Sequence, residues 1–180
     1  NISETNDYNF IINDSTTYWQ QINDGHGIYR YTNLNNSKVY FNENIQRLIQ
    51  NYRSSFLQLG LQNLYSTDLN GKDKTLNLLE MMDDYFPPNV IPTTDPELDI
   101  QIGRIYNQAG KPKKLIERLE NIQKRKDLNL EHKIYIGQIY MNDFPDSSFS
   151  INYYKNLYNE YPYIPDIVYS LIQSYAKADQ

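Results

Sequence analysis

Few side chains in this sequence have the type and spacing needed for acid–base or metal chemistry. The two histidines, His26 and His132, belong to no His-x-x-x-His or Glu-x-x-His pattern. Because histidine metal sites need several ligands brought together, we expect neither a metal nor a cofactor. His26 lies between two glycines, which indicates a loop, and His132 is expected on the surface in the first turn of a helix.

The carboxylates also favour structural roles. Asp83 and Asp84 are adjacent, and neighbours on a helix point about 100° apart, so they form no acid–base pair by themselves. Asp95, Glu97 and Asp99 cluster where a helix is expected to begin, and the helix dipole favours negative charge there. The chain has no cysteine, no phosphate-binding glycine loop and no G-x-S-x-G motif. We therefore predict no catalytic residues and assign no binding residues.

Composition narrows the classes of partner. The net charge of −5 argues against nucleic acid, and the mean hydropathy of −0.73 argues against a membrane span. The basic stretch 111–126 is interpreted as a solvated helix face, with contact to anionic lipid or an acidic partner as the alternative. The high tyrosine content, eighteen residues, is explained either by the AT-rich codons of the genome or by a tyrosine-rich recognition surface. The chain opens without Met or an apolar leader, so we expect it to begin inside a longer gene product or after a cleavage.

Apolar residues recur at helical spacing from Asn42 onward. Asn70-Gly71 and Pro87-Pro88 interrupt the pattern, and Pro96, Pro112 and Pro165 are suited to first helical turns. The expected helices cover residues 42–69, 73–86, 96–109, 112 onward, 130–142, 146–161 and 165 onward. A short helix is also expected near 15–22.

A repeat of tetratricopeptide length is the most specific signal. Ile102–Tyr106 (IGRIY) recurs as Ile136–Tyr140 (IGQIY) after 34 residues, and Leu171–Tyr175 (LIQSY) follows after 35. Glycine inside a helix costs about 1 kcal/mol relative to Ala, so Gly103 and Gly137 indicate close helix crossings. Leu59-Gly60 resembles the same position in a longer first repeat.

The two tyrosines of this repeat, Tyr106 and Tyr140, are interpreted as core residues, with ligand contact as the alternative. The fold expected is all-α, a TPR-like α-solenoid of about three antiparallel helix pairs plus a terminal helix over residues 41–180. A loop-rich N-terminal segment, residues 1–40, is expected to pack on the array.

Five short stretches carry a family resemblance. Residues 39–56 contain VYFNENIQRL and NYRSSF, and LEMM, YFP and VIP follow within 79–92. The pattern resembles the soluble C-terminal tail of bacterial multi-span membrane proteins similar to protein O-mannosyltransferases, which are GT-C glycosyltransferases with an N-terminal membrane domain of unknown function. Asn42 stands where that family has Asp, and Gln46 where Arg is common. The resemblance covers about residues 28–122.

This resemblance implies an extracytoplasmic, periplasmic or cell-surface location and attachment to a membrane through a missing N-terminal part, with catalysis residing in that part. The expected function is a non-catalytic interaction or scaffold module that binds a protein partner or self-associates. The alternative is a free-standing extracytoplasmic binding or polymer-forming assembly protein. An enzyme is disfavoured, because no catalytic residues converge in the sequence.

Overall fold

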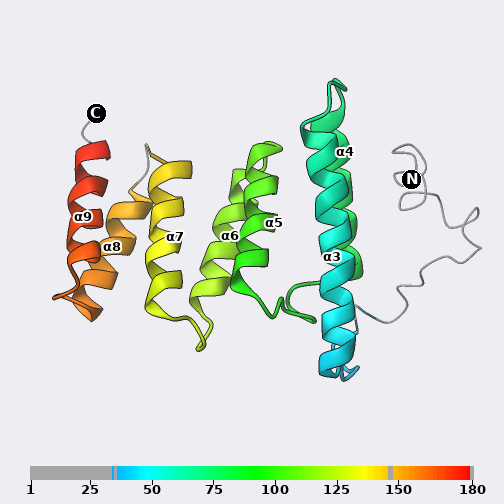
Figure 1. Ribbon diagram of the computed structural model, residues 1–180, viewed down its shortest axis with the longest axis horizontal. Helices are drawn as coiled ribbons and strands as arrows, with labels where there is room; N and C mark the ends of the chain where they lie inside the picture. Colours follow the sequence, from blue (N-terminus) through cyan, green and yellow to red (C-terminus); the bar gives the residue numbers. More distant parts are fainter. Residues whose placement is uncertain (1–33, 35, 146–147, 179–180) are drawn as a thin grey trace, which may run out of the picture. The chain divides into compact units, whose positions relative to one another are not determined.

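The computed structural model describes residues 34, 36–145 and 148–178. Within these ranges the chain forms seven helices and no strand, which confirms the all-α prediction. The helices are α3 (Glu43–Leu64), α4 (Gly71–Tyr85), α5 (Pro96–Gln108), α6 (Pro112–Gln123), α7 (Leu130–Asp143), α8 (Phe149–Glu160) and α9 (Pro165–Ala178) (Figure 1). The predicted helix near 15–22, the glycine-flanked His26 and nearly all of the predicted N-terminal segment lie outside the described residues.

Local sequence explains where the helices begin and end. Asn42 accepts a hydrogen bond from the Ile45 amide at 3.0 Å, and Asp95 and Asn129 cap α5 and α7 in the same way. Gly110 follows α5 with a φ of 98°, a conformation that glycine adopts without strain. The Lys111 amide then donates to the Tyr106 carbonyl at 2.8 Å, closing a Schellman turn. The predicted boundaries agree with these ends to within about two residues, except at α3, which ends about five residues early, and at the start of α8.

The chain divides into two compact units, Asn1–Arg118 and Leu119–Gln180, and the division falls within α6. In the first unit, α3 and α4 pack side by side and antiparallel (Figure 1). Thr75 near the start of α4 donates to the Gly60 carbonyl late in α3, whereas Arg53 in the middle of α3 meets Phe86 after the end of α4. Their shared core also includes α5 residues; its largest apolar members are Ile49, Phe56, Leu78, Leu79, Met82, Phe86, Ile91, Ile102 and Tyr106.

A close helix crossing joins α5 to the start of α6. A Cβ atom at Gly103 would lie 2.8 Å from Leu115 Cδ1 and 3.3 Å from its Cα, distances that leave no room for a side chain. Asp99 meets Arg118 further along the same pair, so the two helices run antiparallel. The glycine thus has the packing role that the sequence indicated.

The second unit contains α7, α8 and α9, with α9 in contact with both others. A Cβ at Gly137 would overlap the Tyr154 ring and lie 2.7 Å from its hydroxyl oxygen, so α8 crosses α7 at the repeat-equivalent glycine. Tyr154, Leu157 and Ile167 form the buried cluster between α8 and α9. No helix in the described part of the chain is both long and apolar enough to cross a membrane.

Candidate functional site

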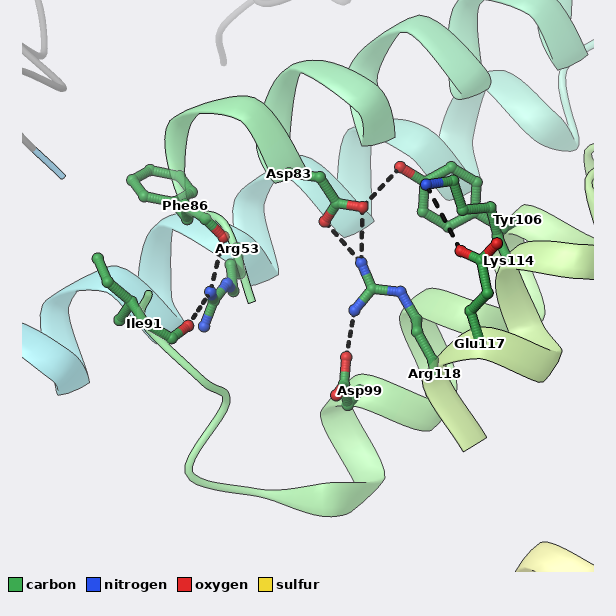
Figure 2. Close-up of polar contacts among 9 residues, drawn as sticks. All are labelled: Arg53, Asp83, Phe86, Ile91, Asp99, Tyr106, Lys114, Glu117 and Arg118. Atoms are coloured by element: carbon green, nitrogen blue, oxygen red, sulfur yellow. Dashed lines mark hydrogen bonds and ion pairs between the residues drawn. The ribbon is translucent and has the colours of Figure 1, made fainter. Parts of the chain in front are cut away.

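The most concentrated polar cluster of the first unit surrounds Arg118 on α6 (Figure 2). Its guanidinium donates to Asp83 on α4 at 2.5 and 2.8 Å and to Asp99 on α5. The Arg118 side chain is 7% exposed and the two carboxylates are 21% and 12% exposed. One cation therefore joins three helices through two carboxylates, in a site largely closed to water.

Tyr106 completes this cluster. Its hydroxyl donates to Asp83 at 2.9 Å, and the guanidinium of Arg118 lies 5.7 Å from its ring centre. Burial and the Asp83 carboxylate raise the pKa of Tyr106 well above its usual value, so the hydroxyl stays protonated. Burial lowers the pKa of Arg118, but the attraction of Asp83 and Asp99 outweighs burial and leaves it raised.

Arg53 forms a second buried arrangement in the same unit, also drawn in Figure 2. It is 2% exposed and donates through Nη2 to the Phe86 carbonyl at 2.9 Å and the Ile91 carbonyl at 2.5 Å. Burial lowers its pKa to about 10, with Asp99 opposing the shift. Its Nη1 is buried without a hydrogen-bond partner among the described residues. Arg53 thereby holds the segment that follows α4 against α3.

These two clusters offer cohesion. The carboxylates of Asp83 and Asp99 are paired with Arg118. The pKa values of Tyr106 and Arg118 are both raised, so neither group releases its proton near neutral pH. In the described ranges, no group of three or more His, Asp or Glu side chains could hold a metal ion. What the arrangement does chemically is tie α4, α5 and α6 together and anchor the chain after α4.

A groove between α3 and the beginning of α5 is an accessible site among the described residues of the first unit. It has a volume of about 540 Å³ and is open to solvent. The residues that α3 contributes to the groove follow its first one after three, four and seven positions. This spacing places them on one face of the helix. The lining residues are Arg47, Gln50, Asn51, Ser54, Thr94, Asp95, Leu98 and Gln101. Seven of these eight are polar, whereas ligand pockets are usually mostly apolar.

Gln50 is the unusual residue of this groove. Both polar atoms of its side-chain amide, Nε2 and Oε1, are buried and have no hydrogen-bond partner within the described chain. Leaving a buried polar group unpaired costs about 1–3 kcal/mol. Ser54 donates to the backbone carbonyl of Gln50 at 3.0 Å, so the amide itself gains nothing from that neighbour.

The structure separates the residues that the sequence analysis singled out. Asp83 points to Arg118 while Asp84 is exposed, so the adjacent carboxylates indeed form no pair. Asp95 caps α5 as expected, but Asp99 belongs to the Arg118 cluster. His132, expected on the surface, is half-buried, and its Nδ1 is buried without a partner among the described residues.

The repeat tyrosines are core residues, as interpreted. Tyr106 is fully buried and Tyr140 is 4% exposed. Tyr140 packs against Phe149 and Tyr153 at ring-centre distances of 5.7 and 5.5 Å, and Gln123 donates to its hydroxyl at 3.0 Å. Burial raises the pKa of Tyr140 to about 12.

Sequence analysis missed the buried charges, although a signal was present. Arg53 lies between Ile49 and Phe56 on the apolar face of α3, and Arg118 lies between Leu115 and Ile122 on that of α6. A charged residue on an apolar helical stripe has to find a buried partner, because burying an unpaired charge is costly. No comparable signal predicts which partner it finds.

One face of α9 carries exposed apolar side chains, although Lys155 of α8 lies 5.3 Å from the centre of the Tyr175 ring. Tyr169, Ile172 and Tyr175 are 63%, 60% and 41% exposed. In the repeat, Ile172 and Tyr175 are equivalent to Gly137 and Tyr140, which α8 covers. The same helical position is thus buried under a following helix in α7 and exposed in α9.

Comparison with known proteins adds no relative: no protein family, no curated protein and no solved structure matches this chain.

Proposed function

We propose that this chain is a non-catalytic, TPR-like helical-repeat module that serves interaction or scaffolding. The observation that carries the proposal is the helix crossing at Gly103 and Gly137, 34 residues apart, each too close for a side chain. A crossing repeated at the tetratricopeptide period supports stacked helix pairs, and such arrays present extended surfaces to partners. The polar groove on α3 and α5 is one such surface.

The setting proposed for this module is the extracytoplasmic tail of a membrane glycosyltransferase, with no cofactor and no nucleic acid bound. Arg53 supports a structural unit built from the stretches that carry the resemblance. It lies within NYRSSF and binds the carbonyls of Phe86 in YFP and Ile91 in VIP. Tyr52 and Phe56 of the same stretch pack on the Phe86 ring, with centres 6.2 and 6.1 Å away.

Mass spectrometry of the native polypeptide in membrane and secreted fractions of the source cells tests this setting. Peptides of this chain joined to a large multi-span protein are the expected result. A secreted species near 21.4 kDa would contradict the glycosyltransferase tail and favour a free-standing protein. A hydrolase or transferase activity of the isolated chain, abolished by one substitution, would contradict the non-catalytic role.

A second candidate function, assembly through self-association, is favoured by the α9 face. Tyr169, Ile172 and Tyr175 give α9 an exposed apolar face in the described chain, and such faces are typical of protein–protein contacts. Because a helix covers the equivalent position of α7, the occupant proposed here is a helix of a second copy of this chain.

A further inference from the structure

We propose that the groove between α3 and α5 binds an extended polypeptide segment, and that the Gln50 amide is the group that recognises its main chain. This inference rests on the proposed function as an interaction module and gives that module a specific site. It starts from two independent observations, an open polar groove and a buried amide in its wall that lacks any partner.

The chemistry of Gln50 selects the ligand. A carboxamide has an oxygen that accepts and a nitrogen that donates, and a peptide unit presents the complementary pair. The amide reaches a ligand through a change of the Gln50 side-chain rotamer, because turning the terminal torsion alone only exchanges the positions of its buried oxygen and nitrogen. In the free protein both polar atoms are buried and unpaired, and pairing with a main-chain unit satisfies both at once.

The dimensions of the groove agree with a short segment. Arg47 and Ser54 are seven residues apart on α3, which is about 10 Å along a helix. An extended chain covers this length with about three residues.

Charge at the groove favours a segment carrying both signs. Arg47 lines it from α3 and takes part in none of the ion pairs found in the described ranges. Asp95 lines it from the start of α5, and Leu98 supplies the single apolar contact. An acidic side chain of the ligand pairs with Arg47 and a basic one with Asp95. Phosphate-rich ligands are disfavoured, because the chain has a net charge of −5.

The test is a nuclear magnetic resonance titration of the whole chain with acetyl-lysyl-glycyl-glutamyl-amide, observing the side-chain amide of Gln50. We expect this signal to shift saturably, and we expect Gln50→Met to weaken binding at least about tenfold, since methionine has similar length but no donor. The matched control is Gln58→Met, an exposed glutamine of the same helix outside the groove, which should bind like wild type.

A second readout separates loss of binding from loss of folding. Gln50→Met removes an unpaired buried amide, so the melting temperature of the free protein should rise by roughly 2–4 °C while binding falls. No shift of the Gln50 amide with the tripeptide, or equal binding by Gln50→Met, would overturn the inference. Shifts produced by methyl glucopyranoside and not by the tripeptide would overturn the peptide as ligand. None of these results bears on whether the native chain is part of a membrane protein, so the two proposals fail separately.

Discussion

Single buried charges have large effects in this protein because each has few partners. Within the described chain, Arg118 is the only cation that forms an ion pair with Asp83 and Asp99. Arg53 is buried and donates its hydrogen bonds to two backbone carbonyl groups. Such groups stabilise the fold only while the whole arrangement is complete, since removing one partner leaves the others buried and unpaired. At the scale of the residue, the structure is therefore most sensitive where a charge lies on an apolar stripe.

Arg118→Met tests this sensitivity. The substitution preserves side-chain length and leaves two carboxylates without their cation, so we expect a loss of about 3–5 kcal/mol in the free energy of unfolding. Urea unfolding followed by circular dichroism measures it. Arg125→Met is the control, because Arg125 pairs with the exposed Asp127 and its loss should leave the unfolding midpoint nearly unchanged. Equal effects of the two variants would contradict the cluster.

Alanine at the repeat glycines distinguishes a tight crossing from a loose one. At Gly137 the new Cβ would overlap the Tyr154 ring, and that ring is held by a hydrogen bond from its hydroxyl to the Ile134 carbonyl. We expect Gly137→Ala to destabilise by about 1–3 kcal/mol. At Gly60 the nearest atom would be Thr75 Cγ2 at 3.7 Å, an ordinary contact.

Gly60→Ala is therefore the matched control and should stabilise by up to about 1 kcal/mol through helix propensity. Thermal melting of both variants gives the comparison. Destabilisation by Gly60→Ala together with an unchanged Gly137→Ala would reverse the packing assignment at the two crossings.

At the scale of the element, α9 differs from α7 although both carry the same repeat. α7 holds glycine where α8 crosses, whereas α9 holds Ile172 at that position and leaves it exposed. The two helices thus differ both in the residue at this position and in what packs on it.

Ile172→Glu tests whether a second copy covers α9. We expect the wild-type chain to self-associate with rising concentration in sedimentation velocity, weakly because the apolar face is small. A charge at the centre of that face should abolish the association. Leu69→Glu is the control, since Leu69 is fully exposed in the connection before α4 and belongs to the first unit. A wild-type chain that stays monomeric at every concentration would remove the support for assembly.

At the scale of the whole molecule, we expect buried tyrosines in both units to govern the response of stability to alkaline pH. Burial raises the pKa of Tyr140 to about 12 and also raises those of Tyr106 and Tyr153. A raised folded pKa gives stability that is complete below the unfolded value of 10.0 and is lost as pH rises towards the folded value. Arg53, whose pKa is lowered to about 10, acts in the opposite direction over the same range.

We therefore expect stability to be steady up to about pH 9 and to fall between about pH 10 and 12. Urea unfolding at a series of pH values, with tyrosinate absorbance recorded in parallel, measures the loss. Tyr140→Phe has no ionisable hydroxyl at this position and should show a smaller fall over that window. An identical pH profile for the variant would show that Tyr140 contributes nothing to it.

The sequence alone determined the helices of this protein. The signals that end helices act within a few residues, so local interactions place the ends of most elements. They are the spacing of apolar residues, the N-caps Asn42 and Asp95, Gly110 after the end of α5, and the prolines between helices. The repeated glycines also predicted close helix crossings. Glycine destabilises a helix interior, so its recurrence at one position indicates that a neighbouring helix packs there.

Only the tertiary structure decided which side chains meet. Arg118 contacts residues 19 and 35 positions away, and the Gln50 amide is unpaired because of what surrounds it in space. Local sequence carries no record of such partners, since they depend on how whole helices are placed against each other. The candidate groove is likewise a product of packing, where polar stripes of α3 and α5 come to line one space.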